Sequence, residues 1–114
     1  MTKFMYLFRR DVKAQWTPSP EQMQQLTQKW MGWVNDLKKN GHAEKGGERL
    51  EASGKVVRGK AKNVSDGPFI EVKDAIQGYL MVEAVDMNQA VELSKGCPVF
   101  EIDGSVEIRP ILSM

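Results

Sequence analysis

The stretch Ser65–Val85, SDGPFIEVKDAIQGYLMVEAV, determines the fold of this chain. Near its start Asp66 comes two residues before Pro68, whose ring fixes φ and keeps the preceding glycine out of the α region. The sequence therefore predicts a sharp turn that the Asp66 carboxylate caps. The segment 78–85 is apolar on both alternating faces apart from one glutamate. A strand of that kind requires cover on both of its faces.

A second strand of the same kind opens the chain, since Lys3–Phe8 is also aromatic and apolar on both alternating sets. Two helices are predicted between the strands. The first begins at Ser19-Pro20-Glu21-Gln22, where a serine cap, a proline and a returning glutamine form a capping box, and runs to about Asn40. The second is capped by Asp86 and ends near Gly96.

The remaining segments predict weaker strands. A strand ends at Glu48–Leu50, behind a glycine pair that indicates a bulge or an irregular edge. Residues 55–63 alternate small or apolar residues with cations, which predicts a half-exposed strand whose basic face discourages edge-to-edge pairing. Near the end, 99–102 and 106–111 flank Asp103-Gly104, the strongest hairpin signal in the chain.

The predicted order is strand, helix, strands, helix, strand, which places the chain in the α+β class. It is the ferredoxin-like order, an antiparallel sheet with two helices on one face, with an extra hairpin in the middle. Residues 1–114 form a single domain in this interpretation. The strands 3–8 and 78–85 are also apolar on the face away from the helices, so we expect a homodimer in which a second copy covers that face.

Composition excludes several classes of function. The 114 residues carry a net charge of +1, which gives no electrostatic reason to expect nucleic acid or an anionic membrane as a partner. The single Cys97 and the single His42 provide neither a disulfide nor a zinc site, and a reducing, cytoplasmic location is expected. No apolar run is long enough to span a membrane. No nucleotide, serine-elbow or metal-binding motif occurs, so we expect no cofactor and no metal.

The chain resembles the YCII-related family, in particular its DGPF branch, which is named for the residues that stand here as Asp66-Gly67-Pro68-Phe69. The resemblance extends over nearly the whole chain. It is carried by the opening strand, the first helix start, the second strand, the start of the long strand, the second helix and the closing strand: Lys3–Phe8, Ser19–Glu21, Gly46–Leu50, Gly78-Tyr79, Asp86–Leu93 and Val106–Pro110.

This resemblance implies a ferredoxin-like protomer that assembles as a dimeric α+β barrel. Asp66 matches the aspartate of the histidine and aspartate pair for which the wider family is considered enzymatic. The histidine has no counterpart, because the first helix contains none and His42 lies beyond its end. Members of the DGPF branch also occur beside, or fused to, sigma-factor-like proteins, which implies an association with transcription.

Candidate site residues follow from the turn and from the matching family positions. Asp66 is the candidate general acid or base if a dimer cavity desolvates it, and the simpler interpretation is that it caps its own turn. Tyr79 either meets a ligand or bonds a carbonyl, and Arg109 either holds an anion or pairs with a glutamate at the sheet edge. The candidate ligand-binding residues are Tyr79, Arg109, Glu71, Lys73 and Arg9.

Two functions remain open from the sequence. The first is a homodimer that binds a small polar organic ligand in a sheet-lined cavity near Asp66, with acid-base catalysis by that residue. The alternative is a non-enzymatic regulatory or accessory interaction module associated with transcription. Asp66→Asn distinguishes them. In the first case a ligand stabilises the wild-type protein against heat and the substitution abolishes that stabilisation, whereas in the second case no ligand stabilises either protein.

Overall fold

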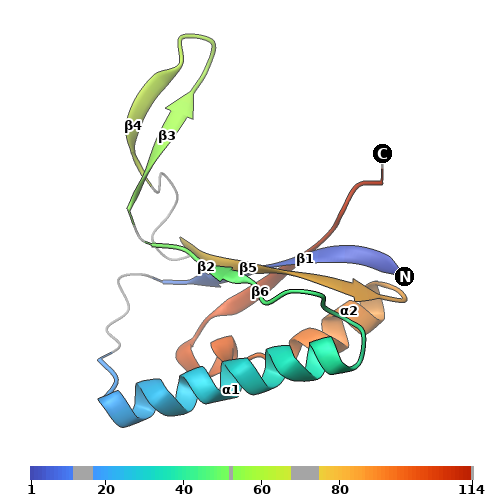
Figure 1. The fold of residues 1–114 in the computed structure, drawn as a ribbon. Helices are drawn as coiled ribbons and strands as arrows, with labels where there is room; N and C mark the ends of the chain where they lie inside the picture. The colour runs from blue at the N-terminus through green and yellow to red at the C-terminus, as the bar shows by residue number, and fades with distance from the viewer. Residues whose placement is uncertain (12–16, 52, 68–74, 114) are drawn as a thin grey trace.

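The computed structural model describes residues 1–11, 17–51, 53–67 and 75–113, and it has the α+β architecture that the sequence predicts (Figure 1). In the part of the chain that the structure describes, four strands separate the two α-helices, and one strand lies at each end of the order. The elements are β1 (Thr2–Arg10), α1 (Pro20–Lys39), β2 (Glu48–Arg49), β3 (Gly54–Arg58), β4 (Asn63–Gly67), β5 (Ala75–Ala84), α2 (Met87–Ser94), the 3₁₀ helix η2 (Pro98–Ile102) and β6 (Ser105–Pro110).

The main sheet is antiparallel and has the strand order β2-β5-β1-β6. The two long strands that are apolar on both faces, β1 and β5, occupy its centre, as their sequences predict. Leu7 of β1 stands between Tyr79 of β5 and Glu107 of β6. The register shifts between Phe8 and Arg9, which marks a bulge in β1.

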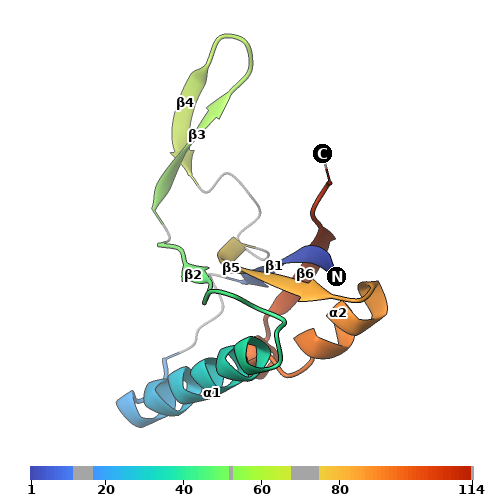
Figure 2. The ribbon, with the colours of Figure 1, turned by 45° about the vertical axis from the view of Figure 1, so that its right-hand side comes forward.

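Both helices lie on one face of this sheet (Figures 1 and 2). The side chains that β1 and β5 turn toward the helices form the core with residues from α1, α2 and η2: Phe4, Tyr6, Phe8, Leu80, Val82, Leu37, Ala90, Cys97 and Val99. The opposite face is only partly covered in the protomer. Met5 and Leu7 are half-buried there, and 38% of Met81 is exposed.

The predicted helix starts are confirmed. Ser19 accepts a hydrogen bond from the Gln22 backbone at 3.1 Å, and the Gln22 side chain accepts one from the Ser19 backbone at 2.9 Å, so the capping box is complete. Asp86 caps α2 by accepting from the Gln89 backbone at 2.9 Å. Gly41 follows α1 with φ of 79°, the left-handed conformation that a glycine terminator provides.

The single strand predicted over 55–63 is wrong, because the chain reverses inside it. Gly59 and Lys62 have positive φ values of 76° and 57°, and the Lys62 amide donates to the Gly59 carbonyl at 3.0 Å. The alternation of small residues and cations therefore continues into a turn. The extra hairpin is present, but it consists of β3 and β4, which form a separate two-stranded sheet.

The hairpin predicted around Asp103-Gly104 is also wrong. Pro98 starts η2 instead, since its fixed φ suits the first helical position and its missing amide hydrogen needs no partner there. Asp103 ends η2 in the left-handed conformation with φ of 58°. A Cβ at Gly104 would lie 2.3 Å from Val99 Cγ2, so the glycine serves a close approach rather than a hairpin turn.

Among the described residues, none of the helices has both the length and the apolar character needed to cross a membrane.

Candidate functional site

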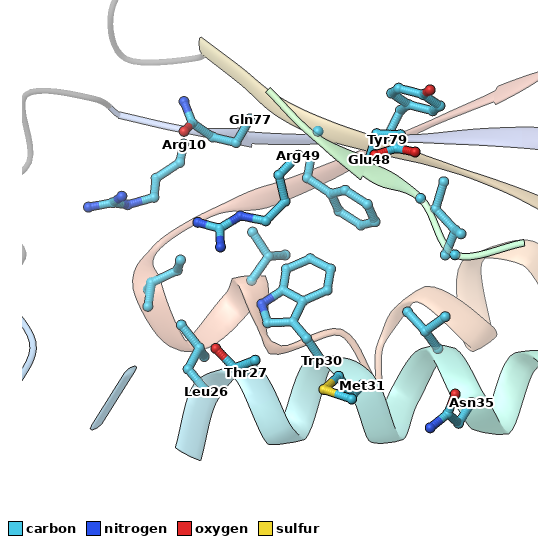
Figure 3. Close-up of a pocket in the computed structure, with 18 of the residues that line it drawn as sticks. Arg10, Leu26, Thr27, Trp30, Met31, Asn35, Glu48, Arg49, Gln77 and Tyr79 are labelled. Carbon is cyan, nitrogen blue, oxygen red and sulfur yellow. The ribbon is translucent and has the colours of Figure 1, made fainter. Parts of the chain in front are cut away.

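A cavity of about 450 Å³ lies between α1 and the β2-β5-β1 side of the sheet (Figure 3). Its apolar wall comes from the helix stripe that the sequence predicts, with Met23, Leu26, Trp30 and Val34 spaced three and four residues apart. Phe8 lines it from β1. The cavity is therefore a product of how the amphipathic helix sits on the sheet.

Glycines bring β2 close enough to β5 to form this edge of the cavity. A Cβ at Gly47 would lie 1.8 Å from the Tyr79 carbonyl oxygen, and one at Gly78 would lie 2.6 Å from the Glu48 carbonyl oxygen. Gly78 also stands opposite Arg49 in β2 and opposite Phe8 in β1. At both glycine positions the absence of a side chain allows the two backbones to approach each other.

Three of the described residues that line the cavity are cations. Arg10, Arg49 and Lys38 line it from β1, β2 and α1. Figure 3 shows the side chains of Arg10 and Arg49 on the helix side of the sheet, in the space above Trp30. Arg49 and Lys38 are exposed and form no ion pair within the part of the chain that the structure describes. The site thus combines an apolar wall with these three cations and the acid Glu48.

The wall is rigid because it belongs to an aromatic cluster. The Trp30 and Phe8 rings meet edge to face with centroids 4.9 Å apart, and Trp33 contacts both. Trp33 Nε1 donates to the Leu93 carbonyl at 3.0 Å, and the Tyr6 hydroxyl donates to the Ala90 carbonyl. These bonds fix the rings between α1, β1 and α2, so the helix and the sheet hold the cavity open between them.

Two titratable groups behind this cluster stay neutral. Burial, together with the neighbouring Cys97, raises the pKa of Tyr6 from 10.0 to about 12. Burial likewise raises the pKa of the Cys97 thiol from 9.0 to about 12, against a smaller opposing effect of the hydrogen bond from the Val99 amide. A thiol with such a pKa is a poor nucleophile at neutral pH, and Cys97 accordingly acts as a small buried core residue.

The predicted site residues Arg9, Arg109 and Tyr79 gather on the sheet face away from the helices. Arg9 Nε donates to Glu107 Oε1 at 2.9 Å, and Arg109 Nη1 donates to Glu107 Oε2 at 3.2 Å. These bonds, first that of Arg109 and then that of Arg9, lower the pKa of Glu107 below its usual range. The glutamate partner predicted for Arg109 is therefore Glu107. In Figure 3 the Tyr79 ring points away from α1.

The structure does not bring Asp66 into this group. Asp66 is a strand residue of β4, its side chain is 87% exposed, and its carboxylate forms an ion pair with Lys55 across the hairpin. The predicted turn that follows it, and the candidates Glu71 and Lys73, lie outside the described residues. Asp66 does not line the cavity against α1. A site that joins it to Tyr79 in the assembled dimer stays a prediction.

Reasoning from the sequence missed Arg10, Arg49 and Lys38 as a group. Arg10 follows a strand that was expected to end at Phe8, and Lys38 was interpreted as a cation suited to the helix C-terminus. The useful signal was Gly46-Gly47 directly before Glu48-Arg49, since paired glycines beside a strand indicate a close backbone approach. The glycine pair indicated where the chain approaches β5, but it did not indicate the cavity between the sheet and α1.

His42 has a structural role at the other end of β5. Its backbone carbonyl accepts from the Glu83 amide at 2.7 Å, and its Nδ1–H donates to the Glu83 carbonyl at 2.8 Å. The histidine is thus bound to the sheet edge rather than to the cavity. Among the described residues no three of the His, Cys, Asp and Glu side chains come together as metal ligands.

The comparisons with known proteins identify the family of the chain. A search of curated proteins found no match. The sequence model of the YCII-related domain matches residues 2–114, which is nearly the whole chain. The chain therefore belongs to the YCII-related domain family.

Proposed function

We propose that this protein binds a small organic anion with an apolar body in the cavity between α1 and the sheet. The observation that carries the proposal is the cavity itself, about 450 Å³ with an aromatic wall and with Arg10, Arg49 and Lys38 among the residues that line it. That volume falls within the range of about 300–1,000 Å³ that is typical of ligand sites. Polar side chains that could orient a ligand also line the cavity: Arg10, Thr27, Asn35, Lys38, Glu48, Arg49 and Gln77.

The two parts of the site would recognise two parts of the ligand. Removing the apolar body from water against Trp30, Leu26 and Phe8 supplies affinity roughly in proportion to the area covered. The guanidinium of Arg49 offers paired donors whose geometry suits a carboxylate or a phosphate. Since Arg49 and Lys38 are exposed, a bound anion gains their charge without a large cost of desolvation.

A homodimer is the second part of the proposal. The strand order β2-β5-β1-β6 with the inserted hairpin β3–β4 supports a ferredoxin-like protomer, and the two-faced strands support a second copy that covers the open face as in a dimeric α+β barrel. The DGPF motif at 66–69 supports a place in the DGPF branch. The cytoplasmic location and the single-domain organisation rest on the sequence.

The ligand site proposed from the sequence, near Asp66 in the dimer, differs from this cavity. The cavity against α1 is preferred because it is complete within one protomer. Acid-base catalysis by Asp66, with Tyr79, Arg9, Arg109, Glu71 and Lys73 around it, requires that a partner subunit desolvate the carboxylate. Asp66→Asn tests that role separately, by comparing turnover of any ligand that binds.

Binding is tested by calorimetric titration with 1-naphthaleneacetate and with the neutral 1-naphthaleneacetamide, which share one apolar body. The acetate should bind more tightly than the amide. Arg49→Gln should weaken the acetate about tenfold, the equivalent of about 1.4 kcal/mol, and should leave the amide unchanged. Lys39→Gln is the control, because Lys39 is an exposed cation of α1 that does not line the cavity.

Equal affinity for acetate and amide would contradict the anionic part of the proposal. Equal effects of Arg49→Gln and Lys39→Gln would contradict the location of the site. A protein that binds neither probe would favour the alternative, a regulatory interaction module without a small ligand.

A further inference from the structure

The β3–β4 hairpin stands apart from the rest of the molecule. Its strands pair only with each other, and both ribbon views show it projecting from the sheet (Figures 1 and 2). The radius of gyration is 15.7 Å, whereas a compact chain of this length is expected to have about 13 Å. An isolated two-stranded hairpin is marginally stable in water. We therefore expect contact with another surface to stabilise the hairpin.

One face of the hairpin is apolar at its centre. Val57 and Val64 stand directly opposite each other, so they share a face, and their exposed fractions are 62% and 64%. The neighbouring pair on the same face is the Lys55–Asp66 ion pair. Because the two exposed valines are adjacent and are flanked by charged residues, they form a small apolar contact surface.

The direction of the hairpin indicates what that surface meets. The hairpin rises on the side of the sheet opposite α1 and α2, where Met5, Leu7 and Met81 are incompletely covered (Figures 1 and 2). The C-terminal segment rises on the same side and carries Leu112, which is 82% exposed. Any molecule that covers this sheet face must therefore lie beside the hairpin.

Charge favours a second copy of this chain as that molecule. The hairpin contains four cations, Lys55, Arg58, Lys60 and Lys62, and one acid, Asp66, so its net charge is +3. The whole chain carries +1, which leaves −2 on the remaining residues. The hairpin of one copy is thus attracted to the body of another.

We propose that the β3–β4 hairpin is a dimerisation arm that packs against the body of the partner subunit. The Val57–Val64 pair supplies the apolar contact, and the cations at the hairpin end face the acidic body of the partner. This inference rests on the homodimer of the proposed function, and it adds a second contact to the sheet-to-sheet one.

Sedimentation equilibrium of the full chain tests the arm. Val57→Asp combined with Val64→Asp should raise the dimer dissociation constant about thirtyfold, equivalent to about 2 kcal/mol, because both valines lose their contact. Phe100→Ser is the matched control, an exposed apolar residue of η2 on the helix side of the sheet, and it should leave the constant unchanged. Raising the salt concentration should weaken the wild-type dimer.

Hydrogen exchange of the wild-type protein provides a readout without substitutions. The amides of β3 and β4 should be protected above the dissociation constant and should exchange rapidly below it. A wild-type monomer at all concentrations would overturn both the homodimer and the arm. A dimer that tolerates the double substitution as well as Phe100→Ser would overturn the arm alone. Protection that appears only when a single-stranded RNA 20-mer is added would overturn the assignment to a second copy.

Discussion

Gly47→Ala is expected to detach the β2 edge of the sheet and to lower the free energy of unfolding. Gly32→Ala is expected to raise the free energy of unfolding. At Gly47 the new Cβ would lie 1.8 Å from the Tyr79 carbonyl oxygen and 2.9 Å from the carbonyl carbon, both of which are backbone atoms. The segment must therefore move away from β5. At Gly32, inside α1, nothing lies within 4 Å of the new Cβ, so only the helix propensity changes.

The magnitudes follow from what each segment loses or gains. Moving β2 breaks the short ladder of Glu48 and Arg49 with β5 and strains the bond from the Leu50 amide to the Gln77 carbonyl. At about 1 kcal/mol for each bond, the free energy of unfolding should fall by about 2 kcal/mol, and Tm by about 10 °C. Replacing glycine by alanine within a helix should raise it by about 0.5–1 kcal/mol.

Urea unfolding followed by circular dichroism, at one fixed protein concentration, measures both effects. Binding of 1-naphthaleneacetate should also weaken in Gly47→Ala, because Arg49 moves with β2, and should persist in Gly32→Ala. Equal stabilities of the two variants would refute the close backbone approach at Gly47. Full ligand affinity in a destabilised Gly47→Ala would refute the role of the β2 edge in the site.

Three further predictions concern titration and reactivity. The free energy of unfolding should fall as pH rises from about 9 to about 12, because the raised pKa values of Tyr6 and Cys97 favour their neutral forms in the folded state. The slope should reach about 1.4 kcal/mol per pH unit for each group, and a flat urea-unfolding profile over that range would contradict the burial of both. Iodoacetamide should modify Cys97 at pH 8 only at the rate of global unfolding, and rapid labelling of the folded protein would contradict its burial. In the wild-type protein the Glu107 carboxylate should stabilise the fold above pH 4.5, and this contribution should be lost as pH falls through its lowered pKa, because Arg109 and Arg9 then lose a charged acceptor. Glu107→Gln should remove the contribution. Identical acid-unfolding profiles of the two proteins would contradict this.

The elements that could be predicted from the sequence are those with local signals. The capping box at Ser19 and the apolar stripe that follows it define α1 almost to the residue. The central position of β1 follows from Lys3–Phe8, which is apolar on both faces and therefore requires neighbours on both edges and cover on both sides. In these segments the local sequence is sufficient to predict the element.

The segments that were predicted wrongly depend on context. The alternation over 55–63 fits a strand as well as a hairpin, and only the positive φ values at Gly59 and Lys62 distinguish them. Asp103-Gly104 suits a hairpin turn, but Pro98 starts a 3₁₀ helix before it and Val99 occupies the space above the glycine. In both cases the local pattern was compatible with two backbone conformations, and tertiary packing selected one of them.

The cavity could not be predicted because its parts come from distant segments. Arg10, Lys38 and Arg49 belong to three different elements, and nothing in their spacing indicates that they line one cavity. The apolar stripe of α1 was visible, but the same pattern is expected of a helix that packs without leaving a space. The close approach of β2 to Gly78, opposite Arg49, becomes meaningful only once the strand register is known.

The contact between His42 and Glu83 has a consequence for solubility. Within the described residues β2 pairs with β5 at Tyr79 and Gly78, and the Leu50 amide bonds the Gln77 carbonyl next to them. The part of β5 near Glu83 would otherwise offer open backbone groups to any extended chain. By bonding both the amide and the carbonyl of Glu83, the histidine occupies one such docking position. Its replacement by alanine should keep the amide bond but release the carbonyl, and the expected symptom is fibril formation on prolonged incubation.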